Sequence, residues 1–284
     1  MRNTIYIFLV LLLSACLPVQ IPITPGGNGN TITVGNKQYQ LVWSDEFNYS
    51  GLPDATKWKF ETGYVRNQEV QYYTNGRLEN CKVENGRLYI TALNDSFENH
   101  PVTSASIETN GLQTFKYGYI EVRAKMPHLG NGTWPAIWTV GTNRDIVGWP
   151  RCGEIDIMEW IGKAPKVVLG STFLPDSNGN VISRNWAYTV TNSYLLTDVF
   201  HNYAVEWDST QIKYYFDNNN YATYTLSDLG SVSWLPLTKE HYLKLNLAMG
   251  GSIPPIGGGG GPIDYTKFPY TFEVEYARYY KRVR

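Results

Sequence analysis

The chain has 284 residues, of which 43% are hydrophobic and 14% aromatic, and its formal net charge is −1. This content suffices for one large folded domain of the size that β-sandwiches and barrels reach. The near-neutral charge argues against nucleic acid or an anionic membrane surface as partner, and no Cys/His spacing indicates a catalytic metal.

The first segment predicts export from the cell. Arg2 precedes an apolar run over residues 5–13 that is too short to span a bilayer and is typical of a secretion signal. The run leads into the letters LSAC, which resemble the bacterial lipoprotein cleavage motif, with Cys16 as the lipidated residue. We expect a signal peptide over residues 1–15, a lipid anchor in the outer membrane, a solvated Pro/Gly-rich tether over 16–38, and a folded domain over 39–284.

Most of the folded domain reads as strands separated by turns. Period-two alternation with many β-branched and aromatic residues predicts strands over 88–93, 118–125, 203–207, 211–216, 242–248 and 272–281. No long segment keeps a helical apolar stripe, so the pattern predicts an all-β antiparallel sandwich. Cys81 and Cys152 fall on different expected strands, and we expect them to stay unpaired, although an oxidising exterior would permit a disulfide.

Three carboxylates lie close together where residues 154–159 read EIDIME. In an extended strand Glu154 and Asp156 share one face, while Glu159 would point into the apolar layer, where an unpaired charge is costly. A β-bulge at Met158 would return Glu159 to the face of the other two acids, and bulges often lie beside active sites. The alternative is that these acids are only the solvated face of an amphipathic strand.

Tryptophans near the acids favour a sugar-binding cleft. Trp134 and Trp138 are four residues apart and therefore share one face of a strand, and Trp149 leads into the acidic segment. Indole rings provide stacking surfaces for sugars, although either ring alone would more simply be a core residue. Two carboxyl groups about 5 to 5.5 Å apart can hydrolyse a glycoside with retention of configuration.

Six segments carry a family resemblance. They read WSDEF at 43–47, RNQE at 66–69, QYYT at 71–74, YG at 117–118, GTWPAIW at 132–138 and CGEIDIME at 152–159. Together they resemble glycoside hydrolase family 16, in its laminarinase-like branch, over about residues 41–281. The resemblance implies a curved jelly roll with a concave substrate cleft, in which Glu154 is the nucleophile, Glu159 the general acid/base, and Asp156 the partner that tunes the proton affinity of Glu154.

The same resemblance implies binding residues outside the catalytic strand. Asn67 lies in the block that holds sugar hydroxyls in the donor subsites, although it could also be only a turn residue. Glu46, Gly86 and Glu275 correspond to a structural calcium site, with the departure that family members usually carry Asp where Glu275 stands. Catalysis itself is expected to need no cofactor, and the protein is expected to act as a monomer on an oligo- or polysaccharide.

Two departures from the laminarinase-like pattern concern the substrate. Phe173 stands where such members usually carry His, and Gly250-Gly251 is followed by Ser252 and Ile253 instead of an early Trp. Loss of a stacking indole would open space for an axial hydroxyl, which favours a retaining endo-β-1,4-galactosidase acting on poly-N-acetyllactosamine, keratan or mucin-type chains. An endo-β-1,3-glucanase (laminarinase) is the alternative, with overlapping activity expected, and a non-catalytic glycan-binding protein would not require all three acids.

Overall fold

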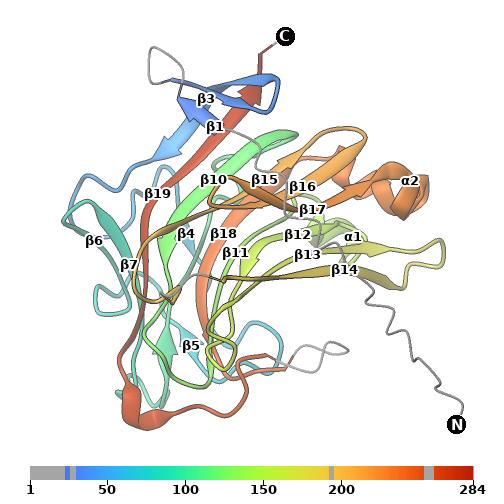
Figure 1. Ribbon diagram of the computed structural model, residues 1–284. Coiled ribbons are helices and arrows are strands. Elements are labelled where there is room, and N and C mark those ends of the chain that lie inside the picture. The colour runs from blue at the N-terminus through green and yellow to red at the C-terminus, as the bar shows by residue number, and fades with distance from the viewer. Residues whose placement is uncertain (1–22, 26–29, 192–194, 253–258, 284) are drawn as a thin grey trace, which may run out of the picture.

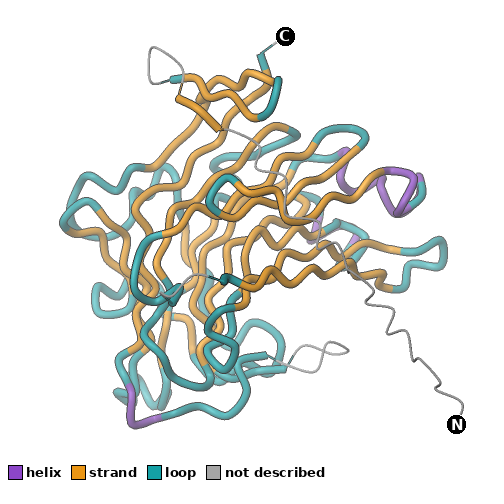
Figure 2. The backbone as a smooth tube through the Cα atoms, viewed as in Figure 1, coloured by secondary structure: helices purple, strands orange, loops and turns teal. Residues whose placement is uncertain are grey.

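The computed structural model describes residues 23–25, 30–191, 195–252 and 259–283. Two large antiparallel sheets pack face to face (Figure 1). Strands and loops make up nearly all of the described chain, and the helices are short (Figure 2). The predicted all-β sandwich is therefore confirmed.

One sheet has ten strands. Its main order is β1 (Ile23–Pro25), β2 (Thr31–Val34), β3 (Lys37–Asp45), β19 (Tyr270–Arg282), β10 (Gly118–Lys125), β15 (His201–Trp207), β16 (Gln211–Phe216) and β17 (Asn219–Thr225). The remaining two, β7 (Arg87–Ala92) and β6 (Cys81–Glu84), join through the pairing of β7 with the first half of β19. The length of β19 lets one strand hold both branches of this sheet together.

The other sheet has seven strands and carries the site. Its order is β14 (Val181–Thr189), β13 (Val167–Pro175), β12 (Glu154–Glu159), β11 (Thr133–Gly141), β18 (His241–Met249), β9 (Ser106–Glu108) and β4 (Lys59–Phe60). A short parallel pair, β5 (Tyr72–Tyr73) with β8 (Thr103–Ser104), forms a third sheet. The helical pieces are α1 (Arg144–Val147), α2 (Leu226–Leu229), α3 (Ser231–Trp234), η1 (Leu235–Thr238) and η2 (Tyr265–Lys267).

The core lies between the two large sheets. Ile137 on β11, Ile155 on β12 and Leu245 on β18 are fully buried in it, together with Val122 and Val274 from the opposite sheet. Because side chains alternate along a strand, the neighbours of these residues on β11, β12 and β18 point to the other face. That face is free to build a site.

All six strands expected from the sequence are present, with ends that differ by at most two residues. The expected tether needs correction, because β1 and β2 lie within residues 16–38 and Val34 is 2% exposed. β-Branched residues at 31–34 allow this segment to pair with β3, so the folded domain begins before residue 39.

The predicted signal peptide, residues 1–15, and Cys16 lie outside the described residues. Over the described ranges, no helix has the length and apolar character needed to cross a membrane. Cys81 and Cys152 are both buried and neither forms a disulfide within the described part of the chain, as expected.

Candidate active site

A cavity of about 450 Å³ lies on the face of the seven-stranded sheet that points away from the core. Glu154, Asp156 and Glu159, all on β12, line it together. Asp156 and Glu159 are only 4% and 6% exposed, while Glu154 is partly exposed. The three carboxylates of the EIDIME segment thus share one cavity, which excludes the simple solvated face of an amphipathic strand.

A β-bulge produces this arrangement. Asp156 pairs with Trp138 of β11 and Met158 with Ile137, so one extra residue, Ile157, is inserted in β12. The pairing with β13 also shifts between Asp156 and Glu159. The expected bulge is therefore confirmed, but it falls at Ile157 and not at Met158. Both side chains are fully buried, so their apolar character did not distinguish the two positions.

Burial raises the pKa of Glu154 to about 7, and cationic neighbours oppose this effect. Arg66 and Arg144 act most strongly against it, followed by a hydrogen bond from Trp149 and the charge of Lys244. Arg66 and Arg144 also line the cavity. These cations therefore make Glu154 easier to ionise than an equally buried carboxyl without charged neighbours.

Glu159 has the opposite surroundings. Burial raises its pKa to about 7, and the charges of Glu154 and Glu69 act in the same direction. The Nε1 of Trp134 donates a 2.9 Å hydrogen bond to Oε1 of Glu159, which acts against them. No cation is among the main influences on this carboxyl. The two glutamates therefore differ in their surroundings, with cations opposing the raised pKa of Glu154 and carboxylates adding to that of Glu159.

Asp156 lies between the two glutamates in sequence and holds its proton most firmly. Burial and the charges of Glu154 and Glu159 raise its pKa well above the usual value, helped by a hydrogen bond to Glu154. Its Oδ2 is buried and receives no hydrogen bond from the described residues. A protonated Asp156 is therefore placed to donate to the carboxylate of Glu154.

The tryptophans contribute to the cavity in different ways. Trp134 and Trp138 line it but are only 5% and 6% exposed, whereas Trp149 is 48% exposed and lies 5.9 Å from the ring of Phe173. The guanidinium carbon of Arg66 lies 5.0 Å, and Nζ of Lys244 4.9 Å, from the centre of the Trp138 ring. Trp149 is therefore the most open of the three indoles, and Trp138 is flanked by two cations.

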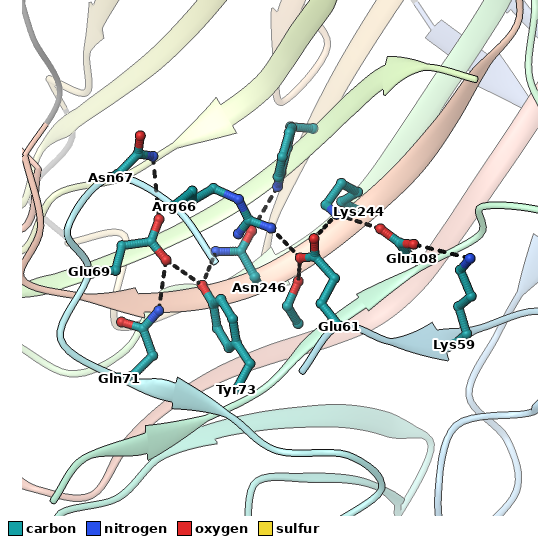
Figure 3. Close-up of polar contacts among 12 residues, drawn as sticks. Lys59, Glu61, Arg66, Asn67, Glu69, Gln71, Tyr73, Glu108, Lys244 and Asn246 are labelled. Carbon is teal, nitrogen blue, oxygen red and sulfur yellow. Dashed lines mark hydrogen bonds and ion pairs between the residues drawn. The ribbon is translucent and has the colours of Figure 1, made fainter. Parts of the chain in front are cut away.

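Asn67 belongs to a hydrogen-bonded loop at the rim of the cavity (Figure 3). Its Nδ2 donates to Oε1 of Glu69 at 3.3 Å, while Gln71 and Tyr73 donate to Oε2 at 2.7 and 3.0 Å. Tyr73 in turn accepts a hydrogen bond from Asn246 of β18. The loop is thus tied to β18 through Asn246, which lines the same cavity as Asn67.

A chain of ion pairs continues from Arg66 of this loop (Figure 3). Arg66 pairs with Glu61, and Lys244 lies between Glu61 at 2.7 Å and Glu108 at 2.5 Å. Lys244 is completely buried, and Lys59 extends the chain toward solvent. Although burial acts to raise it, the pKa of Glu61 is lowered to about 2 by Arg66 and Lys244, so Glu61 is held in its charged form.

The expected calcium site does not form. Arg278 holds Glu46 with two hydrogen bonds, of 2.9 and 2.7 Å, and Arg123 holds Glu275 at 2.6 Å. Gly86 lies in the turn between β6 and β7. Over the described ranges, no group of three or more His, Cys, Asp or Glu side chains could hold a metal ion. The arginines supply the positive charge that a cation would otherwise provide, so these residues do not fit calcium.

The sequence reasoning missed several residues of the cavity. Arg66 and Glu69 lie in the same RNQE block as Asn67, so this block carries a signal for all three residues. Arg144 and Asn246 also line the cavity, and no motif pointed to either of them. Phe173, which had been noted as a departure, is part of the cavity wall.

Comparisons with known proteins agree with this geometry. The family model "Glycosyl hydrolases family 16" matches residues 65–267. The chain is 38% identical over 254 residues to a beta-glucanase of Rhodothermus marinus, covering 86% of each. The solved structure of the laminarinase from Rhodothermus marinus gives a TM-score of 0.77 at 36% identity, covering 87% of this chain and 98% of that one.

A third relative has a different substrate in its name. The chain is 33% identical over 258 residues to a keratan-sulfate endo-1,4-beta-galactosidase of Sphingobacterium multivorum, covering 89% of this chain and 57% of that protein. Fold, cavity and comparisons together define an endo-acting glycosidase that hydrolyses O-glycosyl bonds. The chain belongs to glycosyl hydrolase family 16 and has its jelly-roll fold.

Proposed function

We propose that this protein is a retaining endo-β-1,3-glucanase in which Glu154 is the nucleophile, Glu159 the general acid/base and Asp156 the partner of the nucleophile. The observation that carries the proposal is the unequal surroundings of the two glutamates in one cavity. Arg66 and Arg144 favour a charged Glu154, whereas only carboxylates add their charge near Glu159. Double displacement requires that division between an ionised nucleophile and a protonated acid.

The reaction proceeds in two steps. Glu159 gives its proton to the glycosidic oxygen while the carboxylate of Glu154 attacks the anomeric carbon, and the aglycone leaves as an alcohol. Glu159, now a carboxylate, then takes a proton from water as the water oxygen attacks the same carbon and releases Glu154. Asp156 donates a hydrogen bond to Glu154 throughout, and its buried position keeps it protonated.

The glucan assignment rests on the similar proteins. It reverses the expectation from the sequence, which placed an endo-β-1,4-galactosidase ahead of an endo-β-1,3-glucanase. The beta-glucanase of Rhodothermus marinus has higher identity than the keratan-sulfate galactosidase, 38% against 33%, and this chain covers more of its length. An endo-β-1,4-galactosidase remains the second candidate because Phe173 forms part of the cavity wall where laminarinase-like members usually carry His. Asn67, Trp134, Trp138 and Trp149 are proposed to contact the sugar.

A product profile on laminarin beside poly-N-acetyllactosamine and porcine mucin tests the assignment. The glucanase proposal expects laminarin to be cut into short oligosaccharides at a rate at least tenfold above that on either galactose-containing glycan. Cleavage of poly-N-acetyllactosamine with laminarin left intact would instead support the galactosidase. The inactive variant Glu154→Gln serves as the control for contaminating activity.

We also propose that the protein is an exported lipoprotein, monomeric and anchored in the outer membrane through Cys16, with cleavage after residue 15. The supporting observation is the LSAC sequence after an apolar run. Cys16→Ala should release the protein from the membrane fraction and abolish labelling by a palmitate analogue. Unchanged membrane association and labelling in that variant would contradict the proposal.

A further inference from the structure

We propose that Glu69 is a fourth carboxylate of the active site, a positioning residue whose negative charge keeps the proton on Glu159. The inference rests on the proposed function, because it assigns a role to Glu69 in the same reaction. Glu69 lines the cavity with Glu159 and is 7% exposed. It belongs to the loop before β5, far in sequence from the catalytic strand.

Glu69 is held rigidly beside the residues that contact Glu159. Val70 donates from its backbone nitrogen to the carbonyl of Met249 at 2.9 Å, which attaches the loop to the end of β18. A Cβ on Gly251 would lie 3.1 Å from Cγ of Glu69 and 3.3 Å from the ring of Trp134. Gly251 therefore packs against both Glu69 and the indole whose Nε1 donates to Glu159.

The hydrogen bonds of Glu69 stabilise its ionised form. Oε1 accepts from Asn67, and Oε2 accepts from Gln71 and Tyr73. Hydrogen bonds donated to both oxygens of a carboxylate favour its charged form over the protonated one. Burial raises the pKa of Glu69 above its usual value, and Arg66 and these three donors act against that rise.

The charge of Glu69 is not cancelled by an ion pair. Arg66 lowers the pKa of Glu69, but its ion pair is made with Glu61, and the described residues give Glu69 no salt bridge of its own. Neutral amide and hydroxyl dipoles hold the carboxylate in place without neutralising it. Its field therefore reaches into the cavity, where it raises the pKa of Glu159.

Several charged and titratable groups surround Glu69 and Glu159. Glu154 and Asp156 lie on β12 with Glu159. The loop and β5 contribute Glu69, Arg66 and Tyr73. Arg144 comes from α1 and Lys244 from β18. Arg66 acts on Glu69 as well as on Glu154 and Glu61, whereas the main charges acting on Glu159 are those of Glu154 and Glu69. This division makes Glu69 the residue of the loop that acts on the general acid.

The test is the pH dependence of kcat/KM, whose basic limb reports the pKa of the general acid in the free enzyme. It is measured on whichever glycan the wild type hydrolyses, so a wrong choice between glucan and galactan does not affect it. In Glu69→Gln the basic limb should move to lower pH by roughly half a unit or more, the direction expected when a nearby like charge is removed. Glu69→Asp, which keeps the charge, should leave the limb close to that of the wild type.

A merely structural role would lower activity equally at all pH values. Should Glu69→Gln fail to fold, Glu69→Ala removes the same charge and leaves room for water, and the same downward shift is expected. A 13C titration of labelled glutamates in the inactive Glu154→Gln background, with and without Glu69→Gln, reads the pKa of Glu159 without any turnover. An unchanged basic limb and an unchanged Glu159 titration would overturn the role of Glu69 while leaving the proposed function intact.

Discussion

The indole of Trp134 donates a 2.9 Å hydrogen bond from Nε1 to Oε1 of Glu159, across the pairing of β11 with β12. The bond depends on the bulge at Ile157, because without that extra residue Glu159 would point into the core. It lowers the pKa of Glu159 against the effect of burial. The same indole thus helps to build the cavity wall and to adjust the general acid.

Trp134→Phe should therefore change the pH profile as well as the rate. Loss of the donor raises the pKa of Glu159, so the basic limb of kcat/KM should move to higher pH and kcat should fall by roughly tenfold to a hundredfold, the range for a hydrogen bond to a charged group. Trp138→Phe is the matched control, since Trp138 donates to Asn246 instead. An upward shift in the control as large as that in Trp134→Phe would contradict a specific effect.

Glu154→Gln should abolish hydrolysis and leave binding largely intact. The amide cannot attack the anomeric carbon, so kcat is expected to fall by roughly four orders of magnitude or more. Isothermal calorimetry with an oligosaccharide should give an affinity within a few fold of the Glu159→Gln variant, which retains the nucleophile. Wild-type activity in Glu154→Gln would remove the proposed nucleophile.

Glu159→Gln should stabilise the folded protein above neutral pH. Burial raises the pKa of Glu159 from 4.5 to about 7, so the native state binds a proton more tightly than the unfolded chain, and stability falls as the pH rises through this range. Removing the carboxyl removes that loss, which should increase the free energy of unfolding by about 3 kcal/mol at pH 8 and by little at pH 4. Urea unfolding at the two pH values measures the difference, and an equal effect at both would contradict it.

Glu61→Gln should destabilise the folded protein at neutral pH. Glu61 has a pKa lowered to about 2, so its contribution to stability is fully present above pH 4.5 and is lost as the pH falls toward 2. The variant leaves Arg66 and the buried Lys244 with one partner fewer and should lose about 3 kcal/mol at pH 7. The loss should shrink between pH 4.5 and 2, and a constant loss over that interval would show that the ion pairs are not its cause.

Patterns local in sequence predicted much of this molecule. Alternation along 118–125 and 211–216 gave strands with the same ends as β10 and β16, since a side chain's face depends only on its position in the strand. The odd spacing between Glu154 and Glu159 required a bulge, and the structure has one. Its position at Ile157 could not be read from two neighbouring apolar residues.

Contacts distant in sequence could not be predicted in this way. Glu46 and Arg278 are 232 positions apart, and their pairing lies where the family resemblance implied a calcium site. The placement of Arg66 over Trp138 depends on how the loop before β5 folds onto the sheet, which no spacing encodes. Likewise, the role assigned to Glu69 required knowing which donors surround its two oxygens.

The stereochemistry of hydrolysis tests the central claim, that Glu154 and Glu159 act as nucleophile and acid in a double displacement, most directly. Proton NMR of the reducing ends formed in the first minutes of hydrolysis by the wild type distinguishes the two anomers before mutarotation mixes them. The account predicts that the β-anomer appears first and the α-anomer grows in later. Initial release of the α-anomer would mean direct attack by water and would contradict the covalent role of Glu154.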